Sequence, residues 1–392
     1  MQPSSNRTRI TFSAFYFLNF FGFGGFFPLL GLYFRDVGLT GTQTGMILSL
    51  GPVVMVLAQP VWGVICDYTQ RSNQVLILTV TMTGMTGLGY LVMDDYGWML
   101  VVAALLAVFQ AAIVPIADSI TMNYVYRVGG DYGSLRLWGA IGFASAAFVM
   151  GKWTETAGLP MIFIGFAAAM GLCALTGLRL PKEKVSFDLD LRTGLTRLMK
   201  VRQFPLFLLA TFLIFGPVQA NNVYFGLLFQ DLGGTLAGVG LGFLLAAGSE
   251  APVMRFAGAW IRRQGLLTVA LFAALVSAAR WMFYSLEPSV FWVYLTTVSQ
   301  GLSVGLFIPA ALQYIRDLAP KEVKTTAISL YSAVGTGLGN WFFTLIGGMI
   351  LDGFDIFTTY LLYGAFTLCG AGILLWVKRL DTSQGRRVEG SA

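Results

Sequence analysis

The stretch AAIVPIADSITMNYVYRVGGDYGSLRLWGAIG, from Ala111 to Gly142, joins two long apolar segments. Each segment contains an ionisable side chain, Asp118 in the first and Arg136 in the second. A charge near the middle of a bilayer costs about 3 kcal/mol on insertion scales, so such residues pair with each other or face a watery cavity. The simpler interpretation is a structural ion pair between two helices. The interpretation that we favour is a substrate or proton site.

The composition places the chain in a membrane. Its 392 residues are 56% hydrophobic and only 11% charged, whereas soluble domains carry about 25% charged residues. Apolar runs of about twenty residues recur from end to end, which predicts a polytopic all-α membrane protein. The chain has no histidine and no Walker sequence, and its three cysteines have no paired spacing. We therefore expect no enzyme activity, no metal, no cofactor and no ATP-driven transport.

Twelve apolar segments predict twelve transmembrane helices. They cover residues 10–34, 41–66, 75–93, 97–127, 135–151, 159–178, 203–230, 236–261, 264–285, 290–316, 325–351 and 355–377. One long polar stretch, 179–202, interrupts the series after the sixth segment. The sequence thus predicts two six-helix bundles, 1–178 and 203–392, joined by a linker.

Lysine and arginine gather in the linker, at both termini and in the even-numbered connections. By the positive-inside rule, this pattern predicts that both termini and the linker are cytoplasmic, in the inner membrane of a bacterial-type cell. The net charge of +6 is then explained by topology, so we expect no nucleic-acid partner. We expect a monomer.

The connection after the second segment reads GVICDYTQR, from Gly63 to Arg71. Gly63 permits close helix packing, and Asp67 can hold an arginine in one conformation and release it in another. Arg127, at the end of the fourth segment, is a candidate partner. The alternative is an ordinary polar turn with a topogenic arginine. The string resembles the loop signature of the major facilitator superfamily, in which it implies a gate.

The string YGSLRLWGAIG, from Tyr132 to Gly142, resembles a signature of the branch of that superfamily that holds lactose permease, nucleoside–proton symporters and phenylpropionate permeases. The resemblance implies twelve helices in two bundles with a central cavity, and it places Asp118 and Arg136 in the substrate site. It also implies a sugar-stacking role for Trp138. Because Trp138 does not share a helical face with Arg136, plain packing is the alternative.

The second half has its own charges in apolar segments, Glu250 and Arg280. Lactose permease uses a histidine and a glutamate on its tenth helix, where this chain has Gln300 and Ser303. Neither of these titrates usefully, so Asp118 or Glu250 must carry the proton if transport is proton-coupled. We expect Arg280 and Gln300 to belong to the substrate site. The alternatives are a permanent Glu250–Arg280 pair, and a facilitator or a carrier coupled to another ion.

Neutral polar residues complete the predicted substrate site. The first segment contributes Tyr16 and Asn19, which lie three apart on one helical face. The seventh contributes Gln219, Asn221 and Asn222. Amides and phenols can recognise the hydroxyls or ring nitrogens of a substrate. Hydrogen bonds between packed helices are the alternative.

These features predict a secondary active transporter that works by alternating access and moves a sugar, a nucleoside or an aromatic acid with protons. We expect Asp118 and Arg136 to face Glu250 and Arg280 across the bundles. An exporter of lipophilic cations or drugs is an alternative, against which the two arginines argue. A non-transporting sensor or scaffold is another, against which the gating loop and the cost of four charges argue.

Overall fold

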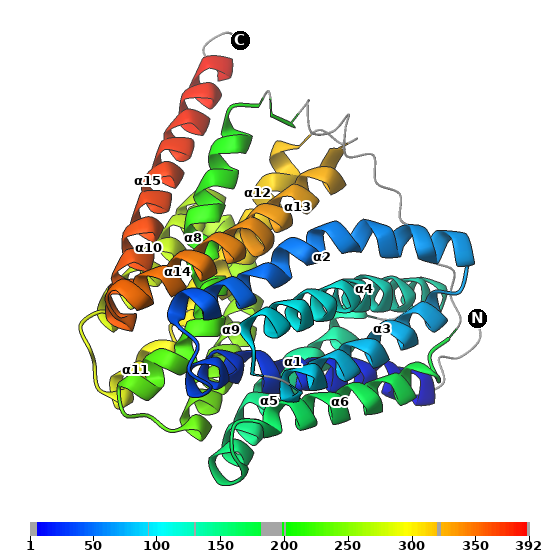
Figure 1. The fold of residues 1–392 in the computed structure, drawn as a ribbon. Coiled ribbons are helices and arrows are strands. Elements are labelled where there is room, and N and C mark those ends of the chain that lie inside the picture. The colour runs from blue at the N-terminus through cyan, green and yellow to red at the C-terminus, as the bar shows by residue number, and fades with distance from the viewer. Residues whose placement is uncertain are drawn as a thin grey trace. The chain divides into compact units, whose positions relative to one another are not determined.

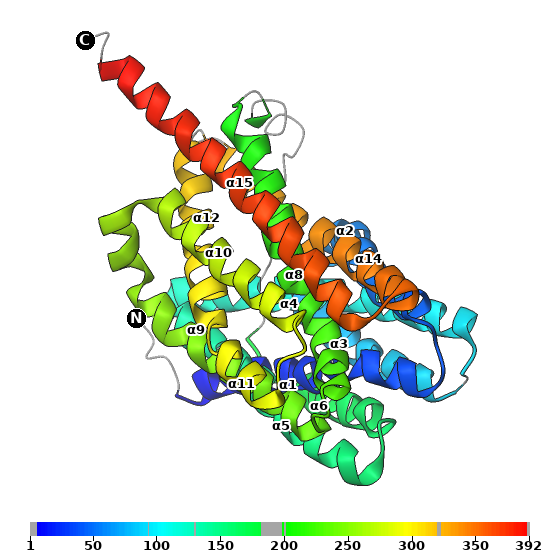
Figure 2. The same cartoon turned by 90° about the vertical axis from the view of Figure 1, so that its left-hand side faces the viewer.

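The computed structural model describes residues 6–92, 94–128, 131–181, 198–199, 201–319 and 323–389, and within them every side chain but those of 251, 325 and 382–389. Over these ranges the chain is helical between short turns and contains no strand (Figure 1, Figure 2). Most of the predicted linker, 182–197 and residue 200, lies outside the described residues.

The helices follow the predicted segments closely. Eleven described helices are long and apolar enough to cross a membrane, and Met161–Gly177 is a shorter apolar one, which confirms the twelve-helix prediction. The helical elements are α1 (Asn6–Asp36), α2 (Gly41–Thr69), α3 (Ser72–Gly87), η1 (Leu88–Leu91), α4 (Tyr96–Val128), α5 (Tyr132–Ala157), α6 (Met161–Gly177), α8 (Gln203–Asp231), α9 (Leu236–Gln264), α10 (Leu266–Tyr284), α11 (Val290–Thr297), α12 (Gln300–Leu318), α13 (Lys324–Ser332), η3 (Ala333–Gly339), α14 (Asn340–Gly353) and α15 (Ile356–Glu389).

Local sequence explains where several helices begin. Thr40 and Gln43 form a capping box at the start of α2, so that two backbone N–H groups at the helix end find partners. Asp131 caps α5 by accepting hydrogen bonds from the backbone N–H groups of Gly133 and Ser134, both at 3.0 Å. This cap fixes the start of the helix that carries Arg136.

The contacts of the chain divide it into two compact units. Unit 1 comprises residues 1–188 and 222–244, and unit 2 comprises 189–221 and 245–392. The helices α8 and α9 are therefore each shared between the units. The boundaries of the two predicted six-helix bundles, and the cytoplasmic location of the termini, stay predictions.

In unit 1, α1 packs against α5 and α6 at very close range. A Cβ atom at Gly142 of α5 would lie 2.2 Å from the carbonyl oxygen of Phe17, and one at Gly24 of α1 would lie 2.2 Å from that of Phe143. Only glycine permits this approach of the two backbones. It places the aromatic face of α1 directly against the arginine-bearing face of α5.

The end of α8 and the start of α9 also belong to unit 1. Arg35, at the end of α1, forms an ion pair with Asp231 at 2.6 Å and donates a second hydrogen bond to Gln230. The carboxylate of Glu155 in α5 accepts a hydrogen bond from the backbone N–H of Ala237 at 2.9 Å. These contacts tie the ends of four helices together.

In unit 2, α10 packs against α15 and α12, as Figure 2 shows for the long α15. Two spans that the sequence predicts as single helices are interrupted here. The tenth is divided at residues 298–299 into α11 and α12, and the eleventh contains the π-helical segment η3. At η3, Gly339 approaches Gly216 of α8 so closely that a Cβ atom on Gly339 would lie 3.0 Å from the Cα of Gly216.

Candidate functional site

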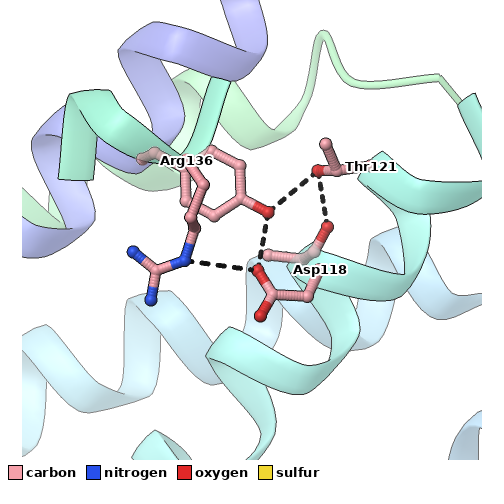
Figure 3. Close-up of polar contacts among 5 residues, drawn as sticks. Asp118, Thr121 and Arg136 are labelled. Carbon is pink, nitrogen blue, oxygen red and sulfur yellow. Dashed lines mark hydrogen bonds and ion pairs between the residues drawn. The ribbon is translucent and has the colours of Figure 1, made fainter. Parts of the chain in front are cut away.

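Unit 1 contains a polar centre built from three helices. Asp118 of α4, Arg136 of α5 and Tyr16 of α1 lie together, and Figure 3 shows the Arg136 side chain directed at Asp118, with Thr121 of the same helix as Asp118 beside them. The Tyr16 hydroxyl donates a hydrogen bond of 2.7 Å to Oδ1 of Asp118. The same hydroxyl lies 3.0 Å from Oγ1 of Thr121, whose distance to the carbonyl oxygen of Ala117 is 2.7 Å.

The hydrogens of this group can be assigned by counting. A phenol has one proton, and an ionised carboxylate only accepts, so the Tyr16 proton belongs to the contact with Asp118. Thr121 then donates its own proton either to the Tyr16 oxygen or to the carbonyl of Ala117. In both arrangements the Tyr16 hydroxyl donates to the carboxylate of Asp118, and in the first it also accepts a hydrogen bond from Thr121.

Arg136 contacts Asp118 loosely. Its Nε atom lies 3.7 Å from Oδ1 of Asp118, and 31% of each side chain is exposed. At that distance the two groups form an ion pair but no hydrogen bond. The guanidinium carbon lies 4.1 Å from the centre of the Phe20 ring, a cation–π contact. Since Arg136 rests on an aromatic ring and uses little of its hydrogen-bonding capacity on Asp118, it can still donate to another molecule.

Unit 2 contains a second polar centre, which is arranged differently. Gln300, at the start of α12, lies between Glu250 of α9 and Arg280 of α10. Its amide oxygen accepts a hydrogen bond of 3.0 Å from Nη1 of Arg280, and its amide nitrogen donates one of 2.9 Å to Oε1 of Glu250. The alternative of a direct Glu250–Arg280 pair is therefore not found in this structure, because a neutral amide separates the two charges.

Arg280 is almost completely buried, with 3% of its surface exposed. Its guanidinium carbon lies 4.2 Å from the centre of the Trp281 ring. The Nε and Nη2 atoms have no hydrogen-bond partner in the structure, nor does the indole nitrogen of Trp281. Buried donors without acceptors are costly, so this site is suited to receive a ligand that supplies acceptor oxygens.

The remaining predicted substrate-site residues have separate surroundings. Asn19 is buried and its amide oxygen has no hydrogen-bond partner. Asn221 accepts a hydrogen bond of 2.7 Å from the Tyr360 hydroxyl, which fits the alternative of an interhelical contact. Gln219 and Asn222 are partly exposed on α8. Their roles stay predictions.

The positions of Trp138 and of the predicted gating residues are clear in the structure, but their roles stay predictions. Trp138 is exposed and takes no part in the contacts around Asp118. Gly63 is buried in the last turns of α2, and Asp67 has one buried carboxylate oxygen without a hydrogen-bond partner. Arg71 and Arg127 are both exposed. The structure does not establish an Asp67–Arg127 contact, so the gate stays a prediction.

Sequence reasoning missed several neighbours of the charged residues. In unit 1 these are Phe20 and Thr121, and Tyr132 interacts electrostatically with both Asp118 and Arg136. In unit 2, Trp281 and Tyr284 contact each other and Tyr360, and Arg280 lies among them. A signal for some of them was present, because Phe20, Thr121 and Tyr284 follow Tyr16, Asp118 and Arg280 by three or four residues. Residues at that spacing share a helical face.

No metal site accompanies these centres. Within the described ranges, no group of three or more histidine, cysteine, aspartate or glutamate side chains could hold a metal ion. The side chains that the two centres bring together are carboxyl, guanidinium, amide and phenol groups.

Comparisons with known proteins identify the family of the chain. The family model described as "MFS_1 like family" matches residues 9–362. The maltose permease of Geobacillus stearothermophilus is 45% identical over 379 residues, which are 96% of this chain and 96% of that protein. The probable 3-phenylpropionic acid transporter of Escherichia coli (strain K12) is 23% identical over 359 residues, 90% of this chain and 91% of that protein.

A solved structure shares the fold. The crystal structure of the nucleoside transporter NupG superimposes with a TM-score of 0.85, at 16% identity, and the match covers 95% of this chain and 99% of that one. The apolar helices and the full-length match to permeases establish a multi-pass protein of the cell membrane that moves a small molecule. The chain belongs to the MFS_1 like family of the major facilitator superfamily, as a secondary transporter and not an enzyme.

Proposed function

We propose that this protein is a proton-coupled sugar permease that takes up a disaccharide such as maltose by alternating access. The full-length identity of 45% to a maltose permease supports the choice of a sugar over a nucleoside or an aromatic acid. The observation that carries the coupling is the Glu250–Gln300–Arg280 arrangement, in which a carboxyl group contacts a neutral amide.

The two carboxyl groups suit different tasks. Asp118 faces the Tyr16 hydroxyl and the Arg136 guanidinium, and both interactions are strongest with a charged carboxylate. Glu250 contacts Gln300, whose amide can serve a charged or a neutral carboxyl because it offers both a donor and an acceptor. We propose that Glu250 carries the transported proton and that Asp118 accepts hydrogen bonds from the hydroxyl groups of the substrate.

The donors of Arg280 support a ligand rich in oxygen acceptors. Its unpartnered Nε and Nη2 atoms can bind sugar hydroxyl oxygens, and Trp281 beside them can pack against a sugar ring. Proton and sugar affinities are then linked, because a change at Glu250 alters the amide that also holds Arg280.

A second candidate substrate, an aromatic acid, is favoured by the same arginine. A carboxylate would pair with the buried guanidinium of Arg280, and its ring would meet Trp281, Tyr284 and Tyr360. Competition of maltose binding by 3-phenylpropionate and by xanthosine separates the three substrate classes. A drug exporter is disfavoured because Arg136 and Arg280 would repel a cation.

The test uses the protein in proteoliposomes. One assay measures uphill maltose uptake driven by a proton gradient, and the other measures maltose counterflow into vesicles that contain maltose. With Glu250→Gln we expect accumulation to fall at least tenfold while counterflow persists, since exchange needs no net proton movement. With Asp118→Asn we expect both to fall, since substrate binding is lost. Glu287→Gln is the matched control, because Glu287 is exposed outside the helices. Unchanged uphill uptake in Glu250→Gln would refute the assignment of the proton to Glu250, and unchanged counterflow in Asp118→Asn would refute the assignment of substrate binding to Asp118.

A further inference from the structure

A pocket of about 370 Å³ lies where α9 ends and α10 begins, in unit 2. The two helices meet at Gly265, whose φ of 83° allows a sharp turn that only glycine adopts readily. The pocket is lined by Trp260, Arg263, Gln264, Thr268, Val269 and Phe272. It is separate from the polar centre, because Trp260 follows Glu250 by ten residues on one helix, about 15 Å along its axis.

One end of the pocket is basic. Arg263 is exposed, and among the described residues it forms no ion pair. The ammonium group of Lys378 in α15 donates a hydrogen bond of 2.8 Å to Oγ1 of Thr268, so a second cation borders the same wall. No lining residue is acidic, and α10 contains no aspartate or glutamate. This end therefore attracts an anion.

The other end is aromatic. The rings of Trp260 and Phe272 meet edge to face with their centres 5.8 Å apart, and each side chain is 43% exposed. Both belong to membrane-spanning helices, and tryptophan in such helices gathers at the level of the lipid headgroups. Phe272 lies six residues into α10, about 9 Å below its start.

We propose that this pocket binds an anionic phospholipid of the surrounding bilayer. Arg263, Thr268 and the adjacent Lys378 face its phosphodiester group, while Trp260 and Phe272 pack against the glycerol backbone and the first methylene groups of a chain. The order of the residues along the helices supports a lipid over a free phosphate. The cations lie at the helix ends, where headgroups are found, and the aromatic rings lie deeper, where chains begin.

A neighbouring arginine gives a matched control. Arg262 has the same charge and is also exposed, but it does not line the pocket. Its Nη1 atom lies near Gly258, at 3.5 Å from the position that a Cβ atom would take there. The guanidinium of Arg262 is thus directed back along α9. If anionic lipid were attracted to basic residues in general, substitution of Arg262 or Arg263 would weaken lipid binding equally. A specific site in the pocket requires Arg263 alone.

The experiment titrates the purified full-length protein in detergent with dioleoylphosphatidylglycerol and counts bound lipids by native mass spectrometry. A basic residue near an anionic lipid surface strengthens binding about fivefold. We expect Arg263→Gln to weaken binding of the first lipid about fivefold and Arg262→Gln to leave it unchanged. Trp260→Leu should weaken binding of both dioleoylphosphatidylglycerol and its zwitterionic phosphatidylcholine counterpart, because the packing surface is shared.

Three outcomes would overturn the proposal. Equal losses in Arg262→Gln and Arg263→Gln would indicate diffuse attraction, and equal affinity for phosphatidylcholine and phosphatidylglycerol would exclude a site for the anionic headgroup. Competition by sodium glycerol phosphate at the concentration of the lipid would indicate a site for the free anion. The melting temperature of each variant without added lipid should match that of the unaltered protein, which shows that the variants fold.

Discussion

Asp118 and Arg136 in unit 1 meet as a long ion pair that is partly open to solvent, whereas Glu250 and Arg280 in unit 2 are separated by the amide of Gln300. Both centres use a carboxyl group and a guanidinium from two helices. In the first, the aspartate has a phenol and a cation as neighbours. In the second, the arginine is buried and two of its nitrogen atoms have no hydrogen-bond partner in the structure. The difference shows that the same two side-chain types are arranged as a direct ion pair in one unit and as an amide-bridged pair in the other.

The largest predicted effect compares the two arginines. Arg280→Lys removes the planar fork that bonds to Gln300 and stacks on Trp281, and lysine does not reproduce either contact. A hydrogen bond to a charged group contributes about 1.5–3 kcal/mol, so we expect maltose affinity to fall by up to about 100-fold. Arg136→Lys should cost about tenfold, because that side chain is partly exposed and its ion pair is long. Isothermal titration with maltose measures both. Equal losses of maltose affinity in the two variants would show that the two arginines contribute equally to binding.

A smaller effect concerns the phenol of unit 1. Tyr16→Phe removes a hydrogen bond to a charged carboxylate, an interaction of about 1.5–3 kcal/mol, so maltose affinity should fall tenfold or more. Thr121→Val is the control, because the Thr121 hydroxyl contacts Tyr16 and not Asp118. That change should cost less than threefold. If Tyr16→Phe binds as well as the unaltered protein, Tyr16 does not orient the carboxylate.

The smallest effect compares two helix caps, one in each unit. Asp355 accepts a hydrogen bond of 2.6 Å from the backbone N–H of Thr358 at the start of α15, as Asp131 does at the start of α5. This backbone hydrogen bond, with a further one from the Thr358 side chain, lowers the pKa of Asp355 below its ordinary value. The cap therefore stabilises α15 fully above the ordinary pKa and is lost as pH falls through the lowered one.

Asp355→Ala should lower the stability of the first turn of α15 by about 1 kcal/mol. Hydrogen exchange, corrected for intrinsic rates, should show about fivefold less protection there at neutral pH, and no further loss of protection on acidification. Asp131→Ala should have the same consequence for α5 and leave α15 unchanged. If the first turn of α15 in Asp355→Ala still lost protection on acidification, the pH effect would belong to another group.

Most of the fold could be predicted from the sequence, because the cost of exposing backbone groups to lipid forces each apolar run into a helix. The interruption near residue 298 could not. There the N–H of Gly301 bonds to the Ser249 hydroxyl at 3.0 Å, and a Cβ atom at Gly301 would lie 2.4 Å from the carbonyl oxygen of Ser249. A contact with a helix fifty residues away thus ends the hydrogen-bond pattern of α11, and no local residue type announces it.

The charged residues of the candidate site could be singled out from the sequence for a related reason. Asp118, Arg136, Glu250 and Arg280 stand out because a charge in an apolar helix is costly. Their neutral neighbours have no such signature. Gln300 stands out in the sequence because it occupies the position of a titrating residue in lactose permease, but its position between Glu250 and Arg280 depends on the packing of three helices. Likewise, the partner of Asn221 is Tyr360, 139 residues away.

The sharing of α8 between the units has a mechanical consequence. Its final part is fastened to α1 by Arg35 and Asp231, and Gly226 lies so near Pro28 that a Cβ atom would approach the Pro28 carbonyl oxygen to 2.9 Å. The helix is continuous from Gln203 to Asp231 and contains Pro217. A displacement of its first part relative to unit 1 must therefore either flex the helix axis or detach this fastened end. The Arg35–Asp231 ion pair and the close packing of Gly226 on Pro28 therefore oppose such a displacement.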